Sequence, residues 1–135
     1  MIEVSKAKGS YIYDHKNKRY LDFVAGVSAC SVGHCNKEVI NAIKDQSEMY
    51  MHVMVYGEFV TKPSLELAKL LAKNLPDSLN CTYFTNSGTE ALEGSMKLAR
   101  RFTGRKKIIA AKNAYHGSTM GALTLMGLEE RKKPF

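Results

Sequence analysis

Cysteine is scarce in this 135-residue chain and occurs in an odd number, three. An odd count does not indicate a disulfide framework, so we expect a reducing compartment, the cytoplasm. No apolar run approaches the roughly 18 residues that span a bilayer, and residues 1–6 lack the apolar core of a signal peptide. These absences argue against a disulfide-stabilised secreted scaffold and against a membrane protein.

The common nucleotide-binding motifs and metal-binding patterns are also missing. The chain contains neither the GxxxxGK[ST] loop nor the GxGxxG fingerprint. Cys30, His34 and Cys35 lie close together, but no second cluster at zinc-ligand spacing accompanies them, so we expect no metal site. No set of Ser, His and Asp residues stands in a recognisable nucleophile context.

Positive charge exceeds negative charge by seven and concentrates in residues 100–107 and 131–133. The first cluster falls at the C-terminal end of a predicted helix, where cations face the carbonyl end of the helix dipole. Aromatic residues that could stack on bases do not interleave with it. We therefore interpret the cluster as a solvated helix end and expect no nucleic-acid partner, and we rank a basic nucleic-acid binder last among the alternatives.

The first 60 residues predict a small hairpin followed by a helix. Aromatic and β-branched residues at 11–13 and 20–23 flank a polar turn that contains asparagine. Residues 24–34 are small and glycine-containing, which predicts a loop. Asn36 can cap the helix that follows, and residues 51–56 are expected to be extended.

From residue 63 onward the pattern predicts alternating helices and strands. An amphipathic helix begins near Pro63 and ends before Pro76. Short apolar runs at residues 81–84 and 107–111 predict buried strands, and each is followed by a predicted helix, the second capped by Ser118 or Thr119. This order favours an α/β fold with an open, mostly parallel sheet. Two strands are too few for such a sheet, so we expect the front part of a larger domain.

The turn Ser87-Gly88-Thr89-Glu90 is the best candidate for chemistry. Ser87 and Glu90 have the spacing of a capping box, in which the serine accepts from the N–H three residues on and the glutamate reaches back to the serine N–H. A strand, a tight turn and a capped helix direct free N–H groups and the positive end of the helix dipole at one spot. This arrangement predicts a phosphate site, although such a turn can also be purely structural.

Tyr115 and His116 follow the next predicted strand, at the same edge of the sheet as Ser87-Gly88-Thr89. Ligands of open α/β sheets bind at the carboxyl ends of strands. Tyr115 could stack on a flat heterocycle or could simply pack against protein. His116 could orient a ligand or could be a structural histidine. The local pattern leaves both alternatives open.

Three separated motifs resemble those of the class-III aminotransferases, in the order that the family has them. Residues 21–26 and 33–34 resemble the family's N-terminal segment. Residues 86–100 resemble its cofactor-phosphate segment, and residues 115–117 resemble its aromatic-His-Gly motif. The resemblance implies the N-terminal part of a fold-type I, aspartate aminotransferase-like large domain at residues 61–135, still incomplete. A small hairpin-plus-helix segment at residues 1–60 precedes it.

The family uses pyridoxal 5′-phosphate (PLP). The resemblance implies that Ser87 and the amides of Gly88 and Thr89 hold the cofactor phosphate, and that Tyr115 stacks on the pyridine ring with His116 nearby. It implies transfer of an amino group, often from an ω-position, to a 2-oxo acid. It also implies a homodimer with sites at the subunit interface, so that residues 53–56, with Tyr56 as a substrate-binding candidate, face the partner's site.

Two departures from the family pattern affect this interpretation. Ser118 stands where acetylornithine- and 4-aminobutyrate-type members have an arginine for the substrate carboxylate, and a serine cannot supply that bidentate charge. The Schiff-base lysine and the aspartate that pairs with the pyridine nitrogen come later than residue 135 in the family. We therefore expect no catalytic residue in this chain and no activity from it alone. The alternatives are a PLP-dependent aminomutase or racemase and a non-catalytic fragment.

Overall fold

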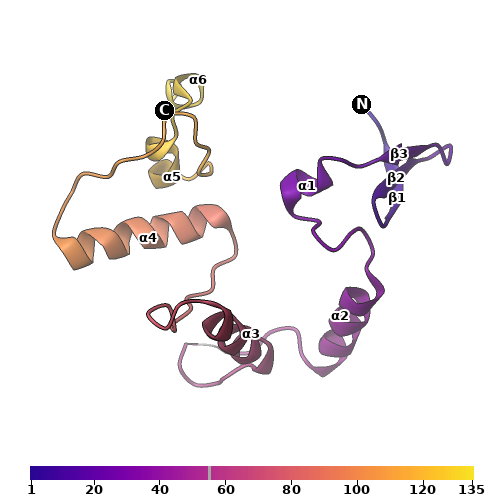
Figure 1. Cartoon of the computed structure of the whole chain (residues 1–135), viewed down its shortest axis with the longest axis horizontal. Helices are drawn as coiled ribbons and strands as arrows, with labels where there is room; N and C mark the ends of the chain where they lie inside the picture. Colours follow the sequence, from indigo (N-terminus) through magenta and orange to yellow (C-terminus); the bar gives the residue numbers. More distant parts are fainter. Residues whose placement is uncertain (55) are drawn as a thin grey trace. The chain divides into compact units, whose positions relative to one another are not determined.

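The computed structural model of the protein describes residues 1–54 and 56–135 and divides into two compact units, Met1–Phe59 and Val60–Phe135. The first unit contains a small sheet and two helices, α1 and α2, and the second contains helices α3 to α6 joined by irregular segments (Figure 1).

The first unit begins with an antiparallel sheet of three strands in the order β1-β2-β3. The predicted hairpin is confirmed as β2 (Tyr11–Asp14) paired with β3 (Arg19–Leu21). Strand β1 (Val4–Lys8) was not predicted, because its lysines give it little apolar alternation. It pairs with β2 and places the Lys6 ammonium 4.8 Å from the centre of the Tyr13 ring.

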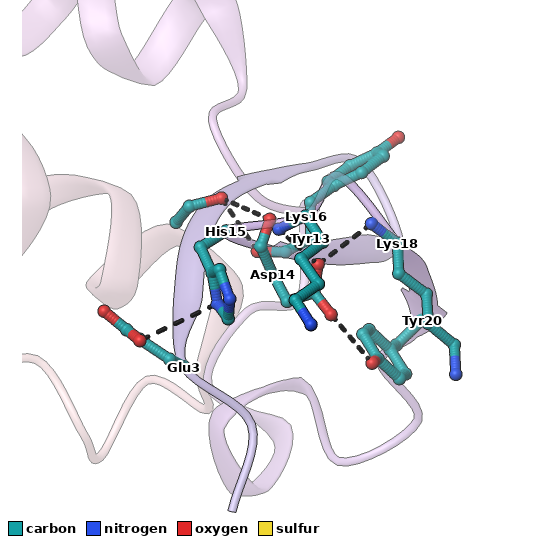
Figure 2. Close-up of polar contacts among 8 residues, drawn as sticks. Glu3, Tyr13, Asp14, His15, Lys16, Lys18 and Tyr20 are labelled. Carbon is teal, nitrogen blue, oxygen red and sulfur yellow. Dashed lines mark hydrogen bonds and ion pairs between the residues drawn. The ribbon is translucent and has the colours of Figure 1, made fainter.

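Asp14 organises the hairpin turn, as Figure 2 shows. Its Oδ1 atom accepts hydrogen bonds from the amides of Lys16 and Lys18, each at 2.9 Å, and its Oδ2 atom accepts from the Tyr20 hydroxyl at 3.0 Å. The polar turn between the two aromatic strands therefore has a specific structure, which is built around one carboxylate.

The segment predicted as a loop at residues 24–34 contains a left-handed turn, α1 (Ala25–Ser28), so that prediction was wrong in part. All four residues have positive φ, between 48° and 68°. Only one of them is glycine, and alanine, valine and serine rarely adopt this conformation, so sequence patterns do not predict it.

Asp22 connects this left-handed turn to the hairpin. Its Oδ1 atom accepts from the amides of Val24 (3.1 Å) and Ala25 (2.9 Å), and its Oδ2 atom lies 2.7 Å from His34 Nε2. The main chain of His34 in turn pairs in both directions with Gly9, at 2.9 and 2.8 Å. The half-buried Asp22 carboxylate thus holds both ends of the segment 24–34 in place.

Helix α2 (Lys37–Met49) begins where it was predicted. The Asn36 side chain accepts from the amides of Glu38 (2.9 Å) and Val39 (3.2 Å), which confirms Asn36 as the cap. The predicted extended segment 51–56 includes Val55, which lies outside the described residues, and its other residues form no strand.

The second unit contains the predicted helices. Helix α3 (Lys62–Asn74) has Pro63 in its first turn, and α4 (Gly88–Thr103) is 16 residues long. Gly104 ends α4 in the left-handed conformation (φ 68°), and Arg100 and Arg101 lie in the last turn. Two short helices follow, α5 (Met120–Leu125) and α6 (Glu129–Lys132).

The two strands predicted at residues 81–84 and 107–111 are absent from the structure. Both segments are irregular, and Tyr83 and Ile109 are 85% and 99% exposed. A strand needs a hydrogen-bonded neighbour, and no neighbouring strand pairs with either segment within residues 1–54 and 56–135. In that part of the chain the buried apolar side chains are Met96, Ala122, Leu123 and Met126, so the core lies between α4 and the segment around α5.

Acid should weaken the hydrogen bonds that the Asp22 carboxylate makes with His34 and with the amides of Val24 and Ala25. The His34 hydrogen bond, and then the amides of Ala25 and Val24, hold the pKa of the Asp22 carboxyl below its ordinary value of 3.8. A carboxyl whose pKa is lowered on folding stabilises the fold above its unfolded pKa, and that stability is lost as the pH falls through its folded pKa. An NMR titration of the Asp22 carboxyl carbon should therefore give a pKa below 3.8, and His34→Phe should raise it.

His34→Gln is the matched control, because its side-chain amide can still donate to Asp22. It should keep part of the shift in the Asp22 pKa that His34→Phe removes. An Asp22 pKa that is the same in all three proteins would contradict the assignment of His34 as the main cause.

Candidate active site

The side chains of Ser87 and Glu90 accept main-chain hydrogen bonds at the start of α4. Ser87 has an extended backbone (φ −155°, ψ 161°), and its hydroxyl accepts from the Glu90 amide at 3.2 Å, which confirms the first half of the predicted capping box. The second half differs. The Glu90 carboxylate accepts at 2.7 Å from the amide of Asn86 instead of that of Ser87, one residue earlier than the capping-box pattern predicts.

The amides of Gly88 and Thr89 form the donor group of the candidate site. They belong to the first turn of α4, where N–H groups have no acceptor inside the helix. Among the described residues, no main-chain or side-chain acceptor is bonded to either amide. A Cβ atom added at Gly88 would meet nothing within 4 Å, so the space beside this residue is open. Two donors and the positive end of a helix dipole suit a phosphate group.

The segment 115–118 passes directly over this helix start. Gly117 has φ +115°, and a Cβ atom built on it would lie only 2.4 Å from Thr89 Cβ. A side chain cannot be accommodated there, so Gly117 both adopts the left-handed conformation and permits the close approach. The two sequence motifs, 28 residues apart, therefore meet at Thr89.

Tyr115 and Ser118 lie at this junction and contact each other. Tyr115 is 59% exposed, its hydroxyl is 3.3 Å from Ser118 Oγ, and the Arg131 guanidinium lies over its ring, 5.6 Å from the ring centre. An exposed ring beside the helix start can stack on a flat ligand.

His116 and Tyr56 are placed differently from these residues. His116 lines an apolar pocket of about 400 Å³ together with Met96, Ala99 and Leu125. Tyr56 belongs to the other unit and is 89% exposed. No contact of the described residues brings His116 to the Gly88 and Thr89 amides.

Glu93 is a residue of the site whose role the sequence patterns did not indicate. From the second turn of α4 its Oε1 atom accepts from the Thr119 hydroxyl at 2.6 Å and from the Ala122 amide at 3.1 Å. Thr119 Oγ1 also lies 2.7 Å from Thr89 Oγ1. The i, i+4 spacing of Thr89 and Glu93 places them on one face of α4, which was the one signal available in the sequence.

Glu93 also replaces the predicted cap of α5. Thr119 occupies the position before this helix, but its hydroxyl makes no capping hydrogen bond, because it bonds to Glu93 and Thr89. The acceptor for the Ala122 amide comes instead from α4. The Thr119 hydrogen bond, followed by the Ala122 and Gly121 amides, lowers the pKa of the Glu93 carboxyl, so the group is ionised at neutral pH.

The described part of the chain contains no group of three or more His, Cys, Asp or Glu residues that could hold a metal ion. None of its helices combines the length and the apolar character that crossing a membrane requires.

Comparison with known proteins places the chain in a family. The model of the class-III aminotransferases matches residues 1–135. The acetylornithine aminotransferase of Archaeoglobus fulgidus is 40% identical over 134 residues, which are 99% of this chain and 35% of that protein. The acetylornithine aminotransferase of Methanopyrus kandleri is 41% identical, again over 99% of this chain and 34% of that protein. The chain thus spans about a third of the length of these curated relatives.

Solved structures of transaminases have the same fold. An (S)-enantioselective ω-transaminase from Thermomicrobium roseum aligns over 100% of this chain and 32% of its own, with a TM-score of 0.93 and 32% identity. A taurine:2-oxoglutarate aminotransferase from Bifidobacterium kashiwanohense, solved in complex with PLP and glutamate, covers 98% of this chain and 30% of its own, with a TM-score of 0.85 and 33% identity. The predicted fold is confirmed as part of the fold that these transaminases have. The chain belongs to the class-III aminotransferases.

Proposed function

We propose that the protein is a PLP-dependent aminotransferase, which moves an amino group from an amino acid or ω-amine donor to a 2-oxo acid. The observation that carries the proposal is the pair of amides at Gly88 and Thr89 in the first turn of α4, which are bonded to no acceptor among the described residues and have open space beside Gly88. Membership of the class-III family supports it, since that family depends on PLP.

The chain's own residues would bind and orient the cofactor. The Gly88 and Thr89 amides bind the phosphate, while the Ser87 hydroxyl fixes the turn by accepting from the Glu90 amide. Tyr115 stacks on the pyridine ring, and its hydroxyl is held by Ser118. His116 lines the adjoining apolar pocket. PLP, when bound, supplies the electron-withdrawing ring that makes amino-group transfer possible.

The substrates and assembly follow from the same interpretation. Ser118 and Tyr56 are the substrate-binding candidates. Ser118 stands where acetylornithine- and 4-aminobutyrate-type members have an arginine for the substrate carboxylate. We place no catalytic residue in residues 1–135 and expect the covalent lysine and the aspartate of the pyridine nitrogen beyond them. We further propose a cytoplasmic homodimer, with residues 61–135 as the start of the cofactor-binding domain.

Transfer of a labelled amino group tests the function. The full-length protein, incubated with PLP, ¹⁵N-labelled ω-amine donors and 2-oxoglutarate, should give ¹⁵N-glutamate by mass spectrometry. Retention of the label in a rearranged or racemised donor would instead show an aminomutase or racemase. A purified protein that binds PLP no more tightly than pyridoxal would contradict the cofactor assignment.

Gly88→Pro should remove one phosphate donor and leave the helix intact. Proline is favoured at the first helical position, and it requires the extended backbone that Ser87 already has. It lacks an N–H, so the full-length variant should bind PLP roughly tenfold or more weakly, the loss expected for a hydrogen bond to a charged group. Equilibrium titration of PLP measures the change.

Gly88→Ala is the matched control, because it keeps the amide and its methyl group meets nothing within 4 Å. It should bind PLP more tightly than Gly88→Pro, and both variants should have the same affinity for pyridoxal, which has no phosphate. Equal PLP affinities in the two variants would exclude the Gly88 amide as a phosphate donor.

Ser118→Arg should restore a preference for donors with a carboxylate. A guanidinium can bind a carboxylate in a bidentate manner, so kcat/KM for such donors, relative to that for amines without a carboxylate, should rise about tenfold. Ser118→Gln also loses the serine contact with Tyr115 but carries no charge, and should leave this ratio unchanged. A ratio that changes equally in both variants would show that Ser118 does not face the substrate carboxylate.

A further inference from the structure

The hydrogen-bond chain from Glu93 to Thr89 has only one possible direction. The ionised Glu93 carboxylate can only accept, so the Thr119 hydroxyl donates to it, over 2.6 Å. A hydroxyl has a single hydrogen, and that of Thr119 is then used. The 2.7 Å contact between the two threonine hydroxyls must therefore be made by the Thr89 hydroxyl, which donates to Thr119 Oγ1.

This direction fixes what Thr89 can offer to an anion. Its hydroxyl hydrogen points to Thr119, and the lone pairs of its oxygen would repel a phosphate. Its main-chain amide, in contrast, belongs to the first turn of α4 and is bonded to no acceptor among the described residues. Thr89 can thus contact a phosphate favourably through the amide and not through the side chain.

The surrounding contacts keep the chain of hydrogen bonds in place. Glu93 Oε1 also accepts from the Ala122 amide at 3.1 Å, and a Cβ atom at Gly121 would lie 2.2 Å from Glu93 Oε2. At the Thr89 end of the chain of hydrogen bonds, the backbone of Gly117 packs closely against Thr89. Thr89, Glu93 and Thr119 are all half-buried, which limits their rearrangement with water.

We propose that Glu93 and Thr119 are positioning residues of the phosphate site, which hold the Thr89 hydroxyl turned away so that Thr89 binds the phosphate through its main-chain amide alone. This inference rests on the proposed function, because it names how the same site takes the cofactor phosphate. It assigns a role to two residues that would not touch the cofactor.

A double-mutant cycle in the full-length protein tests the inference, with the PLP dissociation constant as the readout. In the wild-type background Thr89→Val should weaken PLP binding by less than about twofold, since the hydroxyl makes no bond to the phosphate. In a Thr119→Val background the released hydroxyl can turn to the phosphate, so Thr89→Val should now weaken binding by about fivefold or more. The conservative background Thr119→Ser keeps the acceptor and should restore the small effect.

Thr124→Val provides the matched control background. Its hydroxyl donates to the Gly121 carbonyl on the same short helix and lies outside the chain from Glu93 to Thr89, so the Thr89→Val effect should stay at its wild-type size. Thr119→Ala repeats the test with a smaller side chain, in case valine disturbs the fold.

Two results would overturn the inference. One is a loss of about tenfold or more for Thr89→Val in the wild-type background, which would make the hydroxyl a phosphate donor. The other is an equal effect of Thr89→Val in the wild-type and Thr119→Val backgrounds. The affinity of the wild-type protein for pyridoxal distinguishes a failure of this inference from a failure of the proposed function. A wild-type protein that binds PLP no more tightly than pyridoxal would refute the proposed function itself.

Discussion

The Glu93 carboxylate is the interaction on which the second unit depends. It stands on the 16-residue helix α4 and accepts from Thr119 and Ala122, at the start of a helix of only six residues. A helix that short is not stable by itself, and its own N-cap residue makes no capping bond. A negative charge from a neighbouring helix supplies both the missing acceptor and a favourable interaction with the helix dipole. The same group thereby places the segment 115–118 over the start of α4.

Local features were predictable from the sequence, because their partners lie within a few residues. The caps at Asn36 and Ser87 and the left-handed end at Gly104 each depend on bonds within one helical turn. Glu93 was missed because its partner Thr119 is 26 residues away. The predictions of strands at residues 81–84 and 107–111 were wrong for a related reason. An apolar run predicts that a segment is buried, but a strand also needs a neighbouring strand to pair with, and the run does not supply one. The left-handed turn at Ala25–Ser28 contradicts residue preferences and is held by Asp22 from outside.

The sequence predicts a chemistry for the candidate site but does not predict how its side chains come together. Helix physics predicts an anion site at Gly88 and Thr89, and the family resemblance implies that the anion is the phosphate of a cofactor. Neither approach indicated that the Thr89 side chain is occupied by Thr119, because hydroxyl direction depends on the protonation state of a third residue. A threonine in a phosphate-binding turn is readily assumed to bind through its hydroxyl, and here the hydrogen bonds around it argue against that assumption.

Two glycines of the site have opposite surroundings, and the difference explains how two short motifs form one surface. At Gly117 a side chain would collide with Thr89, so glycine permits protein to contact protein. At Gly88 a Cβ atom would meet nothing, so the space beside this residue is open to a ligand. A helix start that was covered over Gly88 as it is over Thr89 would have no anion site. The open side therefore lies at Gly88, and a ligand of the two amides would approach from there, with Tyr115 and Ser118 on the neighbouring segment.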